Sequence, residues 1–301
     1  MTSGGQRGGQ SSGSGIGPNA GKVRSYYDAC AEQEWQRLDR HRMEWHTTWR
    51  AMAEHIPLGS DILDVGGGPG RYAIALARAG HRVTLLDLSG VSVDLARQKA
   101  QEAGARLAGA VQGDALDLGR FGDESFDVVL LMGPLYHLTG AADRERALAE
   151  ALRVLRTGGL LFASFITRYA LLVDLLKHDP AGAAARQPLV EQLLATGISV
   201  VSGDNPGFTD AYFAIPAEID PLMARRGLRR LRLAASEPLV AIAETAVNAL
   251  PPEAFAVWAD LCYRLGEDPA TWGAAEHMLY VGRKMPGLLR RLRRERTGRG
   301  V

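Results

Sequence analysis

The sequence has few cysteines and no long apolar run. Cys30 and Cys262 are the only two cysteines among 301 residues, and their spacing is unlike that of a metal site. We therefore expect neither a disulfide framework nor a structural zinc. No stretch is long enough to span a membrane, and the Gly- and Ser-rich segment 1–21 lacks the apolar core of a secretory signal. A cytoplasmic protein without membrane contact is the expectation.

Net charge is small and unevenly distributed. The chain carries a formal charge of +1, yet residues 282–301 hold eight Arg or Lys against one Glu, which leaves −6 for the rest. A nucleic-acid-binding protein usually has clustered basic residues on a folded face, and this chain has its dense basic cluster in the tail. Nucleic acid is therefore disfavoured as a partner. The tail itself could contact an acidic carrier or be a solvated, frayed end.

Strand-like and helix-like patterns alternate along the chain. Buried-type strands are predicted at 61–65, 82–87, 106–112, 126–132 and 160–166, with two more at 228–234 and 277–282. A helix is predicted between most of these strands, and one from about Asp143 to Leu155 is expected to be closed by Gly158 and Gly159. Such alternation is typical of a parallel sheet. We predict an α/β fold with a Rossmann-like, doubly wound, seven-stranded sheet.

Additional segments surround the predicted core. Trp35, Leu38, Trp45, Trp49, Met52 and Ile56 recur at steps of mostly three and four residues, which predicts one amphipathic helix from about 25 to 55 with Arg42 on the same stripe. The expected organisation is a disordered leader (1–21), an N-terminal helical cap (22–58), a cofactor-binding core (59–166), a lid insertion (167–215), the C-terminal part of the sheet (216–284) and a basic tail (285–301).

A glycine turn follows the first strand. Gly66, Gly68 and Gly70 allow a sharp turn and bring bare backbone against a ligand. The third small residue of the dinucleotide fingerprint is replaced by Arg71, which counts against NAD, and no Gly-Lys-Ser or Gly-Lys-Thr follows. Asp87 ends the second strand, where its carboxylate could accept both ribose hydroxyls of an adenosyl group or could simply be a polar strand end.

The segment Ile62-Leu63-Asp64-Val65-Gly66-Gly67-Gly68-Pro69-Gly70 resembles motif I of the class I S-adenosylmethionine-dependent methyltransferases of small-molecule type, and the resemblance extends over about residues 23–284. It implies S-adenosylmethionine as cofactor. Gly113-Asp114-Ala115 resembles the loop whose Asp binds the adenine amino group. The implied cofactor-binding residues are Tyr27, Arg42, Asp64, Gly66, Gly67, Gly68, Asp87, Leu88, Asp114, Ala115, Met132 and Gly133.

Two of these assigned residues, Arg42 and Tyr27, have a second interpretation. A buried Arg42 needs an anionic partner, which could be the methionine carboxylate of the donor or a local acid such as Asp28 or Glu32. Tyr27, with Tyr26, resembles the tyrosines that close over the donor in small-molecule members of the family, but both could be core aromatics.

The acceptor is expected beside the end of the fourth strand. Tyr136 and His137 follow this strand, and we assign them as catalytic, His137 as candidate base and Tyr136 more as a wall. His137 could instead be hydrogen-bonded to structure. From the lid we assign substrate contacts to Arg168, Tyr169, Asp210 and Tyr212, although lid charges are usually solvent-exposed.

The residues after strand four exclude several related chemistries. Met132-Gly133-Pro134-Leu135-Tyr136 differs from the Asn- or Asp-Pro-Pro-aromatic sequence of nucleic-acid amino methylases, and no cysteine nucleophile or carboxylate cluster lies there, so we expect no metal. The predicted function is methyl transfer to an O or N atom of a small molecule, a bacterial specialised metabolite. Alternatives are a peptide or small-acid carboxylate acceptor, with Arg168 and the lid holding the acid, or a non-catalytic donor-binding protein. The expected partner is the small-molecule acceptor, with a homodimer left open.

Overall fold

The computed structural model describes residues 19–201 and 208–287. The predicted leader up to residue 18 and the tail from residue 288 therefore lie outside the described residues. Among the described helices, none is long and apolar enough to cross a membrane.

A seven-stranded sheet forms the centre of the molecule. Its order is β3-β2-β1-β4-β5-β9-β8. The strands are β1 (Asp61–Val65), β2 (Arg82–Asp87), β3 (Gly109–Gln112), β4 (Phe126–Leu131), β5 (Leu155–Ile166), β8 (Leu228–Ala235) and β9 (His277–Lys284). The first five run parallel, and β9 pairs antiparallel with both β5 and β8. The predicted Rossmann-like sheet is confirmed.

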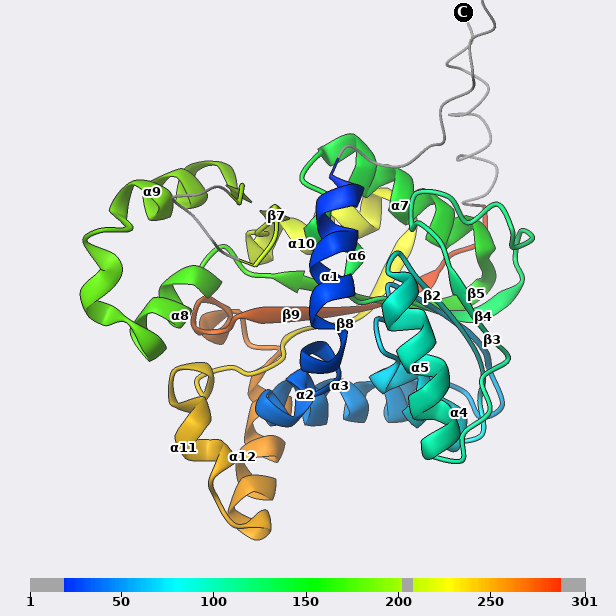
Figure 1. Ribbon diagram of the computed structural model, residues 1–301, viewed down its shortest axis with the longest axis horizontal. Helices are drawn as coiled ribbons and strands as arrows, with labels where there is room; N and C mark the ends of the chain where they lie inside the picture. The colour runs from blue at the N-terminus through cyan, green and yellow to red at the C-terminus, as the bar shows by residue number, and fades with distance from the viewer. Residues whose placement is uncertain (1–18, 202–207, 288–301) are drawn as a thin grey trace, which may run out of the picture.

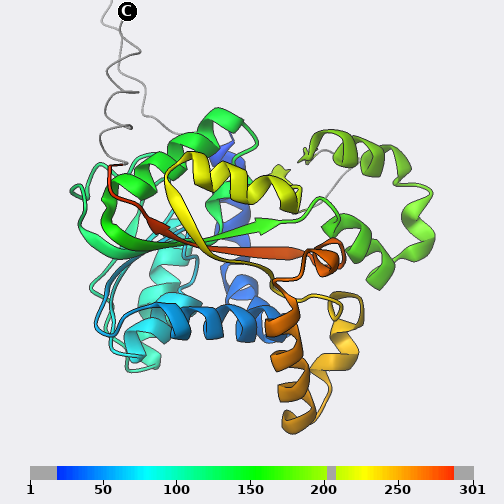
Figure 2. The ribbon, with the colours of Figure 1, turned by 180° about the vertical axis from the view of Figure 1, so that it is seen from behind.

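Helices cover both faces of this sheet (Figures 1 and 2). One apolar core lies beneath α6 (Pro134–His137), α7 (Ala141–Val154) and α10 (Pro216–Arg225). The other lies beneath α3 (Arg42–His55), α4 (Arg71–Arg78), α5 (Gly90–Glu102) and part of α12 (Pro252–Leu265). Apolar side chains of the central strands face both cores, as expected for parallel strands that are buried on both sides.

The N-terminal cap is three helices rather than the single helix predicted. These are α1 (Ala20–Trp35), α2 (Arg37–Arg40) and α3. The chain leaves the helical conformation at His41, where φ is −103° and ψ is 60°. This break lets α1 cross the carboxyl edge of the sheet while α3 packs on one face, as Figure 1 shows. Periodicity alone did not reveal the break, because Leu38, Met52 and Ile56 still reach one core.

The helix before β5 ends within one residue of the predicted Leu155, but β5 begins five residues before the predicted position 160. α7 stops at Val154 because Leu155 is already extended and pairs with Phe126 of β4. Gly158, with φ of +83°, therefore lies within β5 instead of ending the helix.

The segment between β5 and α10 holds α8 (Ala170–His178), η1 (Pro180–Ala183), α9 (Gln187–Thr196) and the short pair β6 (Ile198–Ser199) and β7 (Ala211–Tyr212). The stretch between β8 and β9, predicted as helical from 239 to 265, contains η2 (Ala241–Ala243), α11 (Glu244–Asn248) and α12, with η3 (Pro269–Ala274) before β9.

Candidate functional site

A cavity of about 150 Å³ opens at the carboxyl ends of the central parallel strands, beneath α1. Ligands of doubly wound sheets bind at this edge. Of the residues assigned from the sequence, the cavity is lined by Tyr27, Asp64, Gly66, Gly67, Gly68, Asp87, Leu88, Asp114, Ala115, Met132, Gly133, Tyr136 and His137. The structure thus brings together the cofactor and catalytic residues that were assigned, with one exception, Arg42.

The glycine turn fits closely against the neighbouring strand end. Gly66 has φ of +74°, and a Cβ there would lie 2.6 Å from the ring of Pro134. Gly68 has φ of +54°, but a Cβ on it would point into open space, with the Glu34 Cγ 4.0 Å away as its nearest neighbour. Gly66 is therefore required by the packing of the protein, whereas Gly68 leaves room in the cavity.

Asp87 is oriented by two backbone N–H groups. The Gly68 N–H donates to its Oδ2 at 2.7 Å, and the Ser89 N–H donates to its Oδ1 at 2.8 Å. Ser89 also caps α5 by accepting from the Ser92 N–H. Burial raises the pKa of Asp87 to about 6 despite these bonds. Each carboxylate oxygen keeps a lone pair for a further donor.

Asp114 presents an acceptor to the same cavity. Its Oδ1 accepts the Leu116 N–H at 2.9 Å. Its Oδ2 is buried and receives no hydrogen bond from the described residues. A buried carboxylate oxygen without a partner is costly, so this atom fits a ligand that brings an N–H or O–H group.

Asp64 is the second-last residue of β1 and is 2% exposed. A Cβ on Gly67 would lie 2.6 Å from its Oδ2. Burial, with the Asp87 charge nearby, raises the pKa of Asp64 to about 7. The cavity therefore holds a carboxyl group that gives up its proton only near neutral pH.

We predict that Asp64→Asn stabilises the unliganded protein above pH 7. An unfolded Asp has a pKa of about 4, so between pH 4 and 7 the folded state keeps a proton that the unfolded state has lost, and the free energy of unfolding falls as the pH rises. An amide side chain at this position does not ionise, so the variant does not lose stability in this way as the pH rises. We expect a gain of about 2 kcal/mol at pH 8, which disappears at pH 4, in urea titrations. The exposed Asp94→Asn is the control, and a loss of stability at every pH would refute the prediction.

His137 links three segments of the chain. Its Nε2 lies 2.8 Å from the Tyr27 hydroxyl on α1, and its Nδ1 lies 2.9 Å from the Thr209 Oγ1. Burial lowers the pKa of His137 to about 3, so the ring is neutral at pH 7. The Thr209 hydroxyl is also placed to donate to the carbonyl of Asp210, which favours the tautomer with hydrogen on Nδ1 and Tyr27 as donor to Nε2.

Tyr136 stands beside the end of β4. Its hydroxyl would lie 3.8 Å from a Cβ on Gly133, and its ring contacts those of His137 and Phe208. Burial raises the pKa of Tyr136, so the phenol is neutral. The described residues give its hydroxyl no hydrogen-bond partner, which leaves that group available to a ligand.

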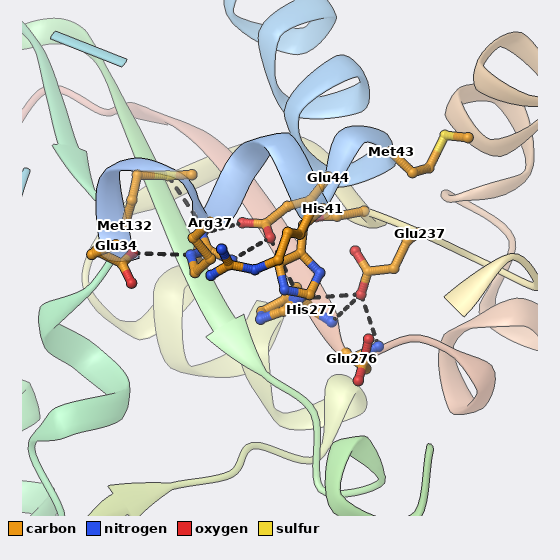
Figure 3. Close-up of polar contacts among 12 residues, drawn as sticks. Glu34, Arg37, His41, Met43, Glu44, Met132, Glu237, Glu276 and His277 are labelled. Atoms are coloured by element: carbon orange, nitrogen blue, oxygen red, sulfur yellow. Dashed lines mark hydrogen bonds and ion pairs between the residues drawn. The ribbon is translucent and has the colours of Figure 1, made fainter. Parts of the chain in front are cut away.

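Arg37 and Glu34 line the cavity and were not assigned from the sequence. Arg37 donates to Glu34 at 2.9 Å and, through both terminal nitrogens, to Glu44 at 2.7 and 3.0 Å (Figure 3). The nearest available signal was the order Glu34, Arg37, Glu44 at helix-compatible steps of three and seven residues. That pattern is common on exposed helices and does not by itself indicate a ligand site.

The structure places Arg42 away from the cavity. Its guanidinium donates to the carbonyl oxygen of Asn248 at 2.6 Å and lies 4.0 Å from the centre of the Phe255 ring. The expected partners were the donor carboxylate, Asp28 or Glu32. The assignment failed because the helix breaks at His41, which directs the next residue toward α11 and α12.

The four residues assigned to the substrate from the insertion lie outside the lining of this cavity. Arg168 is buried and donates to the carbonyls of Phe213 and Leu194. Asp210 is buried, accepts the Val201 N–H and pairs with Lys22 of α1 at 3.2 Å. Tyr212 lies under the Arg144 guanidinium and contacts Glu218, and Tyr169 is half-buried. In this conformation their contacts are within the protein.

Residues 63–163 match a family described as a methyltransferase domain. The tRNA 5-carboxymethoxyuridine methyltransferase of Escherichia coli (strain K12) is 33% identical over 135 residues, which cover 44% of this chain and 51% of that protein. The ubiquinone biosynthesis O-methyltransferase of Xanthomonas axonopodis pv. citri (strain 306) is 37% identical over 145 residues, 46% of this chain and 59% of that protein.

The crystal structure of Burkholderia thailandensis 1,6-didemethyltoxoflavin-N1-methyltransferase, with bound 1,6-didemethyltoxoflavin and S-adenosylhomocysteine, covers 88% of each chain with a TM-score of 0.55 and 17% identity. Residues 63–163 therefore form a methyltransferase domain by family, and the fold is that of S-adenosylmethionine-dependent methyltransferases. The cofactor implied by this domain, and by the S-adenosylhomocysteine bound to the Burkholderia enzyme, is S-adenosylmethionine. The chain spans about half to three fifths of the length of the two curated relatives.

The residues present fit this cofactor. The buried Asp114 Oδ2 can accept from an adenine amino group, and Asp87 can accept ribose hydroxyls beside the open space at Gly68. The described residues hold no group of three or more His, Cys, Asp or Glu side chains that could bind a metal ion.

Proposed function

We propose that the chain transfers a methyl group from S-adenosylmethionine to an O or N atom of a small molecule by in-line displacement. One observation supports this most directly: a single cavity joins the adenosyl-type acceptors Asp87 and Asp114 to the aromatic side chains Tyr136 and His137. When bound, the cofactor supplies an electrophilic methyl group, which the acceptor atom displaces with release of S-adenosylhomocysteine. Alignment of the reactants then supplies much of the acceleration.

The acceptor side of the cavity is aromatic. Tyr27, Tyr136 and His137 line the cavity, and Phe208 packs against Tyr136 and His137, with the ring centroids of contacting pairs between 4.6 and 6.4 Å apart. Planar apolar molecules pack well against such walls. The mildly acidic body of the protein and its lack of a dense basic cluster outside the tail support a small molecule over nucleic acid. The bias toward Ala, Arg and Gly is typical of GC-rich bacteria and supports a specialised metabolite as the acceptor.

The carboxylate-acceptor alternative has less support. It relied on Arg168 to hold the acid, and that guanidinium is engaged with two backbone carbonyls. We therefore propose amine, heterocyclic nitrogen or acidic hydroxyl acceptors, which need no strong base.

We propose that His137 acts as a hydrogen-bond acceptor that orients Tyr27, and not as the base. A ring whose pKa is about 3 takes up a proton poorly at neutral pH. Tyr136, with its free hydroxyl, is the residue we propose to contact the reacting groups.

The test is a reaction of the purified protein with S-adenosylmethionine and panels of aromatic amines, N-heterocycles, phenols and carboxylic acids. A product heavier by one methylene unit, with an equal amount of S-adenosylhomocysteine, supports methyl transfer and identifies the acceptor class. Donor binding without turnover of any panel would support the non-catalytic alternative. Absence of donor binding would overturn the proposal.

The Tyr27–His137 bond predicts energetic coupling between these two residues. We expect Tyr27→Phe and His137→Gln each to lower kcat/KM, and the double variant to lose no more than the worse single variant. The coupling energy should be about 1 kcal/mol, close to the net contribution of one hydrogen bond. Fully additive losses would show that the two side chains act independently. Binding of S-adenosylhomocysteine, measured in parallel, controls for collapse of the cavity.

A further inference from the structure

A row of buried and half-buried charged side chains leads from the cavity into the protein (Figure 3). It begins with Glu34 and Arg37 in the cavity wall and continues through Glu44 of α3. Behind Glu44, the His277 Nδ1 lies 3.8 Å from its Oε2 and 3.2 Å from the Glu237 Oε1. The charges alternate in sign along the row.

The inner end of this row is firmly held. Glu237 Oε1 accepts the backbone N–H groups of Glu276 and His277 at 2.8 and 2.6 Å. Burial alone would lower the pKa of His277, but Glu44 and Glu237 outweigh that effect and raise it to about 9. His277 is therefore protonated at neutral pH, and Glu44 lies between two cations.

Stability alone is a weak reason for such a row. Replacing a buried ion pair with apolar side chains is often neutral or stabilising, whereas its directed hydrogen bonds fix geometry. Arg37 has five N–H groups, and the contacts with Glu34 and Glu44 use three of them. The two that remain are available to an anion in the cavity.

Arg37 pairs with Glu34, whose Cγ would lie 4.0 Å from a Cβ on Gly68 in the glycine turn after β1. The Arg37 charge acts on Tyr136, which stands beside Gly133 at the end of β4. Asp87 and Asp114 occupy the ends of β2 and β3, where the adenosyl group is proposed to bind. The opposite end of the donor is an amino acid with a carboxylate, and Arg37 suits that group.

We propose that Glu44 and His277 are positioning residues that hold Arg37 for the carboxylate of the amino-acid end of the donor. This rests on the proposed function in so far as the cavity binds S-adenosyl compounds. Glu44 lies on α3 and His277 on β9. Both would act on the ligand only through Arg37.

Two ligands distinguish a role of Glu44 and His277 in positioning Arg37 from a role in stabilising the fold. S-adenosylhomocysteine carries the amino-acid end, whereas 5′-methylthioadenosine has the same adenosyl thioether without it. We would measure the Kd of both by calorimetry for the wild type, Glu44→Gln and His277→Gln. We expect the Kd of S-adenosylhomocysteine to rise at least tenfold in the variants. The Kd of methylthioadenosine should change less than twofold.

Two further variants complete the design. Arg37→Lys keeps the charge and the fold but loses the forked geometry, and it should weaken S-adenosylhomocysteine alone. It decides the question if the Glu44 and His277 variants fail to fold. Arg232→Gln removes a buried guanidinium that pairs with the exposed Glu267 and does not line the cavity, and it should change neither Kd.

The outcomes discriminate between the two proposals. Equal weakening of both ligands, or unchanged S-adenosylhomocysteine binding in the variants, would overturn the positioning role. A wild type that binds both ligands equally well would also overturn it, because Arg37 would then contribute nothing to the amino-acid end, while the proposed function would stand. A wild type that binds neither ligand would overturn the proposed function and this inference together.

Discussion

Gly68→Ala is expected to weaken S-adenosylhomocysteine binding by more than about 100-fold, or about 2.7 kcal/mol. A Cβ at this position meets no protein atom closer than 4.0 Å, so it would occupy cavity space that the ligand needs. The backbone cost is separate: the φ of +54° penalises any residue with a Cβ by about 1–2 kcal/mol. The measurement is calorimetric titration combined with urea unfolding.

Gly104→Ala is the matched control for this substitution. Gly104 has φ of +62°, and a Cβ there would have no neighbour within 4 Å, far from the cavity lining. Both variants should therefore lose similar stability, and only the Gly68 variant should lose binding. Equal affinities in the two variants would show that no ligand approaches Gly68.

Asp87→Ala is expected to reduce S-adenosylhomocysteine affinity by about 100-fold or more. The ionised carboxylate is held by the Gly68 and Ser89 N–H groups with its remaining lone pairs free, and charged acceptors make the stronger hydrogen bonds. Because the pKa of Asp87 is about 6, wild-type affinity should also fall as the pH drops below 6, and this fall should be absent in the variant.

Asp28→Ala serves as the control for Asp87. Asp28 accepts the Ser89 hydroxyl at 2.6 Å but does not line the cavity, so its loss should change affinity only a few-fold. Titration with NAD completes the experiment. NAD binding that survives while S-adenosylhomocysteine does not bind the wild type would contradict the donor assignment.

Most of the sheet could be predicted because its signals are local. The runs that became β1, β2 and β4 are mainly apolar and bounded by turn residues, and the structure has their ends within about one residue of the prediction. The break at His41 and the early start of β5 depend on contacts with distant segments. His41 reaches Glu244, and Leu155 pairs with Phe126, and neither contact is visible in a short window of sequence.

The same distinction applies to the cavity. The glycine turn and Asp87 lie close together in the sequence, so their spacing was sufficient to place them in one site. Arg37 was missed because its significance depends on Glu44 and on His277, which follows at the far end of the chain. Arg42 was preferred because it shared a stripe with the tryptophans, and that stripe assumed an unbroken helix.

The position of β9 has a consequence for how the protein matures. β9 is the last of the described strands along the chain, yet it lies between β5 and β8. During synthesis the glycine turn and Asp87 emerge early, whereas His277 is made only after nearly all of the sheet. A chain arrested before β9 would carry the adenosyl half of the cavity without the strand that orders Arg37. Competence to bind the donor fully would thus be acquired only when the sheet closes.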